Sequence, residues 1–306
     1  LLVVGKAFWC PHTKEELTEE KQRQMANKAA PRHVCEYKTK KLKSTAAKKW
    51  IIRLDTPQKI VEFEDLIRGK IKFDTFLLGD IAIAKDEKTP LYNLAVVIDD
   101  YLMQISHVIR GEDHISNTPK QILLQEIFGF SRPKYGHLPL VLGPDRSKLS
   151  KRHNVVSVDE YRKAGYLSEA IINFIALLGW NPGTEQEIFS LDELVKKFDL
   201  SRAQKGGAIF NIERLNWLNG IYIRKKSAKE LTNLILQEGF LEIPENSKGQ
   251  MKFKNDYIEK IVALEQSRIE KLSEIGERTH YFFSNPKFPK SMLFWEGKES
   301  PDAKIH

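Results

Sequence analysis

The order of apolar and polar residues divides the chain into segments of different periodicity. Residues 13–30 follow a polar helical pattern, in which Thr13 and Glu16 have the spacing of a capping box and Pro31 ends the pattern. From Ile51 onward the pattern changes to short runs that predict β-strands, namely "IIRL", "VEFEDLI" and "IAIAK".

Residues 92–143 carry the pattern of an α/β unit. The run "NLAVVIDDYLMQ" predicts a helix, and "ISHVIRG" after it predicts a buried strand that ends in charged residues. A second helix is expected over 118–129, with Asn117 or Thr118 as its cap, Pro119 at its first position and Gly129 after its last turn. The following run "YGHLPLVLG" predicts another buried strand.

Beyond residue 155 the pattern is mainly helical. Apolar residues recur at helical spacing over 167–178, and two more capping boxes follow, Ser190 with Glu193 and Ser227 with Glu230. The expected fold class is therefore α/β plus α: a β-rich segment with one helix, part of an α/β sheet, and a helical tail.

Composition excludes several protein classes. The 306 residues are 41% hydrophobic and 29% charged, as in a folded globular protein, and no apolar run approaches the length of a membrane span. Cys10 and Cys35 alone cannot form a disulfide framework, so a reducing, cytoplasmic compartment is expected. The formal net charge of +8 fits either a polyanionic partner or merely a basic surface.

The loop "SKLSKR" follows the second predicted strand of the α/β unit. Lys148, Lys151 and Arg152 place three cations together, with the hydroxyls of Ser147 and Ser150 beside them. This combination suits a polyphosphate ligand, but a solvated basic loop has the same composition.

A second polar cluster, "RGEDHISNTP", begins at the end of the first predicted strand. Arg110 could hold a carboxylate through two hydrogen bonds, and Glu112 and Asp113 could orient it or bind a ribose hydroxyl. The alternative is an ion-paired loop with a helix cap. Both clusters lie at the carboxyl ends of predicted strands, where open α/β sheets bind nucleotides.

Four segments in collinear order make a family resemblance visible: "PLYNLAVVIDDYLMQISHVIRGEDHISNTPKQILLQEIFGF", "YGHLPLVLGPDRSKLSKR", "GYLSEAIINFIALLGWNPG" and "IFNIERLNWLNGIYIR". The chain resembles bacterial glutamyl-tRNA synthetases of class I from about residue 1 to at least residue 224. This implies a partial class I Rossmann fold with an inserted α+β domain and helical regions after it. The implied divisions are an inserted acceptor-binding domain (1–91), the second Rossmann half (92–144), a helical stem-contact domain (145–225) and the start of the anticodon-binding helices (226–306).

The resemblance implies an activity and its residues. Glutamate would react with ATP, accompanied by Mg²⁺, and the glutamyl group would pass to tRNA(Glu). The run "KLSKR" is similar to the family's KMSKS motif, so ATP would contact Lys148, Leu149, Ser150, Lys151 and Arg152, with Lys151 stabilising the leaving pyrophosphate. Glutamate would contact Tyr92, Arg110 and Asp113.

One family motif is absent from the 306 residues. Class I synthetases carry a first ATP motif, HIGH or a variant, and no such tetrad occurs in this sequence. We therefore expect a fragment that lacks about a hundred residues before Leu1 and most of the anticodon domain. As given, it is expected not to form glutamyl adenylate.

Some members of the family bind structural zinc through a C-x-C pair and a later C-x-H pair. Here the matching residues are "CPH" and "CEY", so Cys10, His12 and Cys35 could provide three ligands, with Tyr37 an unusual fourth. The alternative is two buried thiols and a surface histidine.

Two other functions remain open. One is the shortened paralogue that glutamylates a queuosine base in tRNA, although it lacks the helices seen here after residue 225. The other is a non-catalytic tRNA-binding protein derived from a synthetase. A monomer without membrane association is expected, and His107, His137 and His153 are expected to be packed or exposed rather than catalytic.

Overall fold

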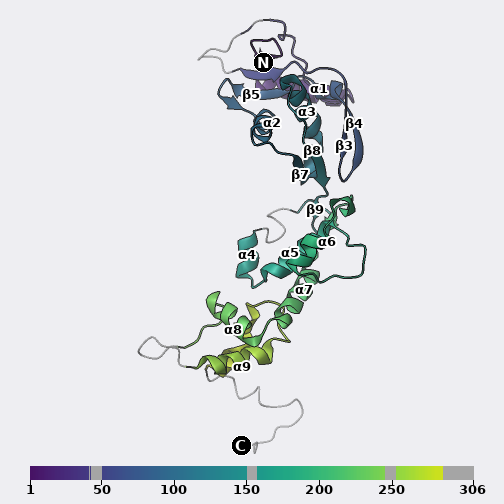
Figure 1. Cartoon of the computed structure of the whole chain (residues 1–306). Coiled ribbons are helices and arrows are strands. Elements are labelled where there is room, and N and C mark those ends of the chain that lie inside the picture. Colours follow the sequence, from purple (N-terminus) through teal and green to yellow (C-terminus); the bar gives the residue numbers. More distant parts are fainter. Residues whose placement is uncertain (41, 43–49, 150–156, 245–252, 285–306) are drawn as a thin grey trace, which may run out of the picture. The chain divides into compact units, whose positions relative to one another are not determined.

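The computed structural model describes residues 1–40, 42, 50–149, 157–244 and 253–284. Its chain forms two compact units (Figure 1). The first unit comprises Leu1–Val141, Gly179–Asn181 and Asp199–Ala208, and the second comprises Leu142–Leu178, Pro182–Phe198 and Ile209–His306. The finer division into four domains stays a prediction.

The first unit is mixed α/β. Its main elements are β1 (Ala7–Cys10), α1 (Lys14–Ala26), β2 (Ile51–Leu54), β3 (Ile60–Asp65), β4 (Gly69–Asp74), η1 (Thr75–Leu78), β5 (Ala82–Asp86), β6 (Thr89–Pro90), α2 (Tyr92–Leu102), β7 (His107–Gly111), η2 (Glu112–Asn117), α3 (Thr118–Phe128), β8 (Lys134–Leu138) and the short η3 (Leu200–Arg202). The strands predicted from "IIRL", "VEFEDLI" and "IAIAK" are confirmed as β2, β3 and β5.

Two four-stranded sheets organise this unit. One has the order β1-β2-β5-β6 with antiparallel pairing, and the other has the order β4-β3-β8-β7. In the second sheet β7 and β8 run parallel, and their register places Arg110 opposite His137. The prediction that "ISHVIRG" is a buried strand is wrong in one respect: among the described residues β7 lies at one edge of its sheet, and its residues are only half-buried or exposed.

The α3 helix supplies much of the core of the first unit. Ile122, Leu123 and Leu124 are fully buried in the cluster that also contains the inward-facing Val61 and Phe63 of β3. β3 alternates exposed and buried positions, as a strand with one packed face should. The helix ends at Gly129, whose φ of 71° is the left-handed conformation that favours glycine.

Two helix-start predictions have different outcomes. Thr13 and Glu16 form the expected capping box before α1, although the helix ends at Ala26 rather than near residue 30. Of the two residues predicted as the cap of α3, Asn117 occupies that position, without a side-chain hydrogen bond, and Thr118 does not. The fully buried Thr118 side chain bonds to other groups, which are described below.

The second unit is mainly helical, as predicted. Its helices are α4 (Val158–Lys163), α5 (Ser168–Gly179), α6 (Leu191–Lys197), α7 (Ile212–Lys225), α8 (Ala228–Gln237), α9 (Asn255–Glu265), α10 (Glu274–Thr279) and η4 (His280–Phe282). The capping boxes of Ser190 and Ser227 are confirmed at the starts of α6 and α8. The two-residue strands β9 (Val141–Leu142) and β10 (Ala208–Ile209) pair with each other.

Two buried asparagines tie these helices to the loops between them. Asn173 accepts hydrogen bonds from the Phe189 backbone N–H and the Tyr222 hydroxyl, both at 2.6 Å. Asn219 accepts from the Leu167 N–H at 2.8 Å and donates to the Glu270 carbonyl at 2.6 Å. Both side chains are fully buried, so these bonds satisfy polar groups that burial would otherwise penalise.

Among the helices of the described residues, none is long and apolar enough to cross a membrane.

Candidate functional site

Arg110, near the end of β7, is held by several partners in the first unit. Its Nε donates to His137 Nε2 at 3.2 Å, and its Nη2 donates to Thr118 Oγ1 and Gln121 Oε1, both at 2.8 Å. The aromatic ring of Tyr135 lies 5.7 Å from the guanidinium carbon. The guanidinium is therefore oriented from the sheet and from α3, on which Thr118 and Gln121 lie.

Tyr92 lies at the other side of the same guanidinium. It begins α2 and is 49% exposed, and its hydroxyl is 3.5 Å from Arg110 Nη1 and 3.4 Å from His114 Nδ1. The structure thus brings together two of the three residues predicted to contact glutamate. A guanidinium and a phenol at one accessible place can bind a carboxylate.

Glu112, directly after β7, pairs with a different arginine from the one that its position in the sequence suggested. Glu112 forms an ion pair with Arg68 instead, and its other carboxylate oxygen accepts the Leu140 backbone N–H at 3.1 Å. Asp113, the third predicted glutamate contact, is exposed on η2 directly after Glu112. The groups that orient Arg110 are Thr118, Gln121 and His137, which sequence reasoning did not assign to the site.

The predicted ATP loop belongs to the second unit and is described only in part. Ser147 donates to Asp145 Oδ1 through its backbone N–H and its hydroxyl, and Lys148 forms an isolated antiparallel bridge with Leu142. Leu149 is the last described residue before the gap. Ser150, Lys151 and Arg152 lie outside the described residues, so their predicted contacts with ATP stay untested.

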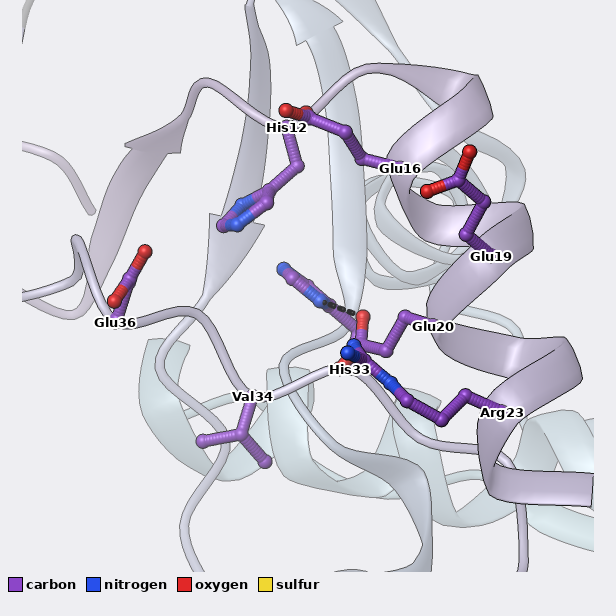
Figure 2. A pocket seen from close by; sticks show the side chains of 8 residues that line it. All are labelled: His12, Glu16, Glu19, Glu20, Arg23, His33, Val34 and Glu36. Carbon is purple, nitrogen blue, oxygen red and sulfur yellow. Dashed lines mark hydrogen bonds and ion pairs between the residues drawn. The ribbon is translucent and has the colours of Figure 1, made fainter.

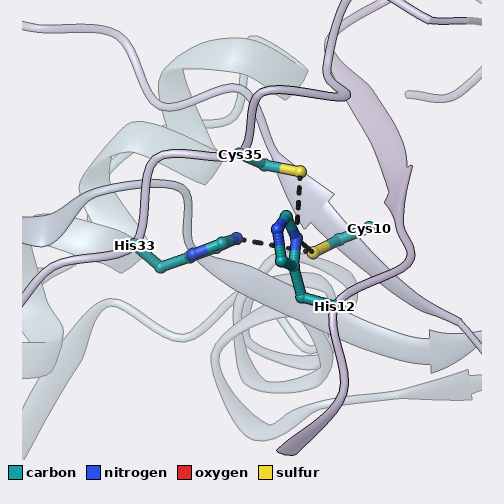
Figure 3. Close-up of side chains that lie close together, drawn as sticks. All are labelled: Cys10, His12, His33 and Cys35. Atoms are coloured by element: carbon teal, nitrogen blue, oxygen red, sulfur yellow. Dashed lines mark hydrogen bonds between the residues drawn. The ribbon is translucent and has the colours of Figure 1, made fainter. Parts of the chain in front are cut away.

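A second cluster in the first unit joins Cys10, His12, His33 and Cys35 (Figure 3). Cys10 ends β1 and His12 follows it, whereas His33 and Cys35 lie in the segment after α1. One potential ligand atom from each residue lies within 4.8 Å of all the others. Sequence reasoning identified three of these residues but named Tyr37 as the fourth and missed His33. The available signal was symmetry, since C-x-H is followed by its reverse, H-x-C.

The spacing of this cluster matches that of a tetrahedral zinc site. Cys10 Sγ is 3.4 Å from His12 Nδ1 and 3.5 Å from His33 Nε2, and Cys35 Sγ is 3.6 Å from His12 Nδ1. Bonds of about 2.3 Å to sulfur and about 2.0 Å to nitrogen, at tetrahedral angles, separate the two ligand atoms by about 3.5 Å. The donor set and its dimensions therefore fit zinc.

Backbone contacts fix the segment that carries His33 and Cys35. The Asp80 carboxylate accepts the Cys35 N–H at 2.8 Å, and the Asp80 N–H donates to the His33 carbonyl at 2.7 Å. Gly79 adopts a φ of 62°, and a Cβ there would lie 2.4 Å from the His33 carbonyl oxygen. Only glycine allows so close a backbone approach, so this position contributes to the cluster's shape.

The α1 helix contributes Glu20, which accepts a hydrogen bond from His33 Nδ1 at 2.6 Å. This contact leaves His33 Nε2 directed at Cys10. Glu20 and His33 line an open pocket with a volume of about 600 Å³. Figure 2 shows them there together with His12 and Glu36. A carboxylate that holds the outer nitrogen of a ligand histidine is a recurring feature of zinc sites.

The two thiols differ in acidity. Burial tends to raise the pKa of Cys10, but hydrogen bonds from His33 and His12 outweigh it and lower the pKa to about 6. Burial and then the neighbouring Cys10 raise the pKa of Cys35 to about 12. The thiolate needed for metal binding thus forms readily at Cys10.

Comparison with known proteins decides the family. The family model described as "tRNA synthetases class I (E and Q), catalytic domain" matches residues 1–217. The chain belongs to this family of class I tRNA synthetases. The fold is accordingly that of a class I tRNA synthetase, with a Rossmann-like catalytic domain and mixed α/β content, as the sequence resemblance implied.

The relatives of this class I synthetase chain include enzymes named glutamate–tRNA ligase. The one from Natranaerobius thermophilus is 40% identical over 291 residues, covering 93% of this chain and 59% of the relative. The one from Carboxydothermus hydrogenoformans is 41% identical over 289 residues, covering 92% and 60%. The chain therefore spans about three fifths of the length of these relatives.

A solved structure supports the same family. The glutamate tRNA ligase from Elizabethkingia meningosepticum, crystallised in complex with its amino acid, superposes with a TM-score of 0.77 at 29% identity. The match covers 95% of this chain and 64% of that one.

Proposed function

We propose that the protein containing this chain is a glutamate–tRNA ligase. It activates glutamate with ATP to glutamyl adenylate, releasing pyrophosphate, and transfers the glutamyl group to the 3′ end of tRNA(Glu). The observation that carries the proposal is the pairing of Arg110 with Tyr92 near the end of β7, in a chain whose relatives bear that name.

In this proposal Arg110 binds a carboxylate of glutamate and Tyr92 adds a hydrogen bond from its phenol. Three partners already hold the guanidinium, so little side-chain freedom is lost when the substrate binds. We propose that the exposed Asp113 binds the ammonium group of the substrate.

ATP binds through the loop after β9 and brings Mg²⁺ with its phosphates. Lys148, Leu149, Ser150, Lys151 and Arg152 form the contact segment, and Lys151 stabilises charge on the leaving pyrophosphate. A preorganised cation at such a position contributes about 100- to 1000-fold in rate. The motif type supports this assignment, since the loop lies in a chain of the class I family.

The tRNA partner is supported by charge. Lys and Arg outnumber Asp and Glu by 49 to 41, and cations that neutralise phosphates release counterions on binding. We infer that residues 1–91 contact the acceptor end, that 145–225 contact the stem and that 226–306 begin the anticodon-binding part, with 92–144 as the second Rossmann half. We also propose that the enzyme acts as a monomer in the cytoplasm.

We propose further that zinc binds at Cys10, His12, His33 and Cys35. Zinc would link the end of β1 to the segment after α1, which stabilises this part of the fold without a role in the chemistry. His12 would bind through Nδ1 and His33 through Nε2, the atoms that face the sulfurs.

The test is exchange of pyrophosphate into ATP by the complete gene product, measured with glutamate, glutamine or aspartate. Glutamate-dependent exchange supports the ligase, and tRNA binding without any exchange supports the non-catalytic alternative. The 306 residues alone contain no HIGH-like tetrad, so this polypeptide is expected to show no exchange. Measurable glutamate-dependent exchange by this polypeptide, with or without tRNA, would refute that part.

A further inference from the structure

His137 is fully buried in the first unit and is bonded at both ring nitrogens. Its Nδ1 lies 2.6 Å from Asp65 Oδ2, and its Nε2 lies 3.2 Å from Arg110 Nε and 3.1 Å from Thr118 Oγ1. It lies on β8, between β3 and β7 in the sheet (Figure 1). A side chain in this position connects the ends of three neighbouring strands.

The partners determine which nitrogen carries the proton. An arginine Nε can only donate, so His137 Nε2 must accept and must carry no proton. An ionised carboxylate can only accept, so His137 Nδ1 must donate to Asp65. Both ends of the ring therefore require the same neutral form, with the proton on Nδ1.

Backbone hydrogen bonds keep the Asp65 carboxylate ionised. Its Oδ1 accepts three backbone N–H groups, from Ile67 at 3.0 Å, Arg68 at 2.9 Å and His137 at 3.2 Å. Burial opposes ionisation, but the bonds from Arg68, His137 and Ile67 outweigh it and lower the pKa of Asp65. Burial also lowers the pKa of His137, against the pull of Asp65.

We propose that His137, fixed in its tautomer by Asp65, is a positioning residue that sets the plane of the Arg110 guanidinium for the carboxylate of glutamate. Asp65 orients the ring, the ring accepts from Nε, and Thr118 and Gln121 accept from Nη2. Nη1 is thereby turned toward Tyr92. The glutamate half of this proposal rests on the proposed function, whereas the orientation of Arg110 by His137 does not.

Protonation of His137 breaks this arrangement. A proton on His137 Nε2 would point at the Nε–H of Arg110, so two hydrogen-bond donors would face each other. The imidazolium and the guanidinium would also repel each other, because both are positively charged. The charged or titratable groups around the ring are Asp65 and Arg68 from the β3 side, Arg110 from β7, and Tyr135 on β8 itself. Arg68 is paired with Glu112 of η2, and α3 contributes only the neutral Thr118 and Gln121.

The first test needs no substrate. In protein labelled with ¹⁵N in histidine and arginine, the His137 ring is assigned by its absence in His137→Gln. We expect a neutral ring protonated at Nδ1 and an Arg110 Nε–H that exchanges slowly with water. The Arg110 signal should move and exchange faster in His137→Phe, and return toward its original position in His137→Gln, whose amide can donate to Asp65 and accept from Arg110.

The second test uses pyrophosphate exchange by the complete gene product. We expect His137→Phe to raise the KM for glutamate about 10- to 100-fold, the range for losing a hydrogen bond to a charged group, with a smaller change in kcat. His137→Gln should recover most of the loss. His107→Gln, at the exposed start of β7, is the matched control and should leave both constants unchanged.

These outcomes separate the two claims. If wild-type protein shows no exchange, the proposed function fails while the tautomer and the Arg110 signal still test the positioning role. A His137 ring protonated at Nε2 overturns the proposal, even if His137→Phe does not fold. The proposal is also overturned if folded His137→Phe leaves the signal and the exchange rate of the Arg110 Nε–H unchanged. It is likewise overturned if His137→Phe and His137→Gln raise the KM for glutamate equally.

Discussion

Arg110 and His137 lie opposite each other on the parallel strands β7 and β8, and the arginine Nε donates to the histidine Nε2 at 3.2 Å. The exposed edge strand supplies the cation that is proposed to meet substrate, and the central strand supplies the group that orients it. The arginine that is proposed to bind glutamate is therefore held by the buried sheet and not only by its own strand.

Replacing Arg110 by lysine should weaken glutamate use strongly. Lysine keeps the charge but cannot bond at once to His137, Thr118 and Gln121, nor form two parallel bonds to a carboxylate. We expect the KM for glutamate in the exchange assay to rise by about 100-fold, and Tyr92→Phe to raise it by about 10-fold or less. Equal effects of the two substitutions would contradict the proposed roles.

The buried histidine predicts a pH dependence of stability. The pKa of His137 in the folded chain lies below its usual value. There is therefore a pH range in which the His137 ring is neutral in the folded chain but protonated in the unfolded chain. The free energy of unfolding therefore loses this contribution as pH falls below 6.5. The raised pKa of His33 acts in the opposite direction, so the comparison of wild type with His137→Gln is needed.

Chemical denaturation at pH 8 and at pH 5 measures that difference. The stability advantage of wild type over His137→Gln should be larger at pH 8 than at pH 5. An advantage that does not change with pH would mean that His137 has its ordinary pKa in the folded chain.

Zinc content tests the Cys/His cluster. Purified protein should hold about one zinc per chain, and Cys35→Ser or His33→Ala should abolish it. Tyr37→Phe is the matched control and should keep its zinc. If it lost zinc, Tyr37 and not His33 would be the fourth ligand, as the sequence analysis suggested. Glu20→Gln should lower zinc affinity about 10- to 100-fold by releasing the outer nitrogen of His33. Chelation should lower the Tm of wild type more than that of Cys35→Ser.

Two glycines in the second unit provide a matched pair for stability. Gly165 has a φ of 88°, and a Cβ there would lie 2.5 Å from the Ser273 backbone nitrogen. Gly239 has a φ of 74° and open space around it. Gly239→Ala should cost about 1–2 kcal/mol through backbone strain alone, and Gly165→Ala should exceed that by at least about 1 kcal/mol because the overlap adds to the strain. Equal losses in urea unfolding would show that the loop at Ser273 can move away.

Local signals in the sequence predicted several elements of the fold, among them α1, β2, β3, β5 and α3. Capping boxes at Thr13, Ser190 and Ser227 mark real helix starts because they depend only on residues three apart. The prediction that "ISHVIRG" is buried was wrong because an apolar run does not reveal whether a strand lies at an edge of its sheet. That property depends on which strands pair, which local sequence does not specify.

The sequence predicted those site residues whose type and position are distinctive. It did not predict the residues that reach the site through contacts between distant parts of the chain. The strand-end position of Arg110 and the cysteines of the cluster could be recognised in the sequence. The partnership of His137 with Asp65 joins strands 72 positions apart, and His33 reaches Cys10 across α1. Thr118 looked like a helix cap because its spacing to Pro119 fits one, whereas its hydroxyl serves Arg110.

Pyrophosphate exchange by the complete gene product is the direct test of glutamate activation by this protein. We expect exchange that requires glutamate and that neither glutamine nor aspartate supports. We also expect a loss of about 100- to 1000-fold in kcat for Lys151→Ala. Exchange that does not require glutamate, or that Lys151→Ala and Arg110→Ala both leave at the wild-type rate, would contradict the proposed function.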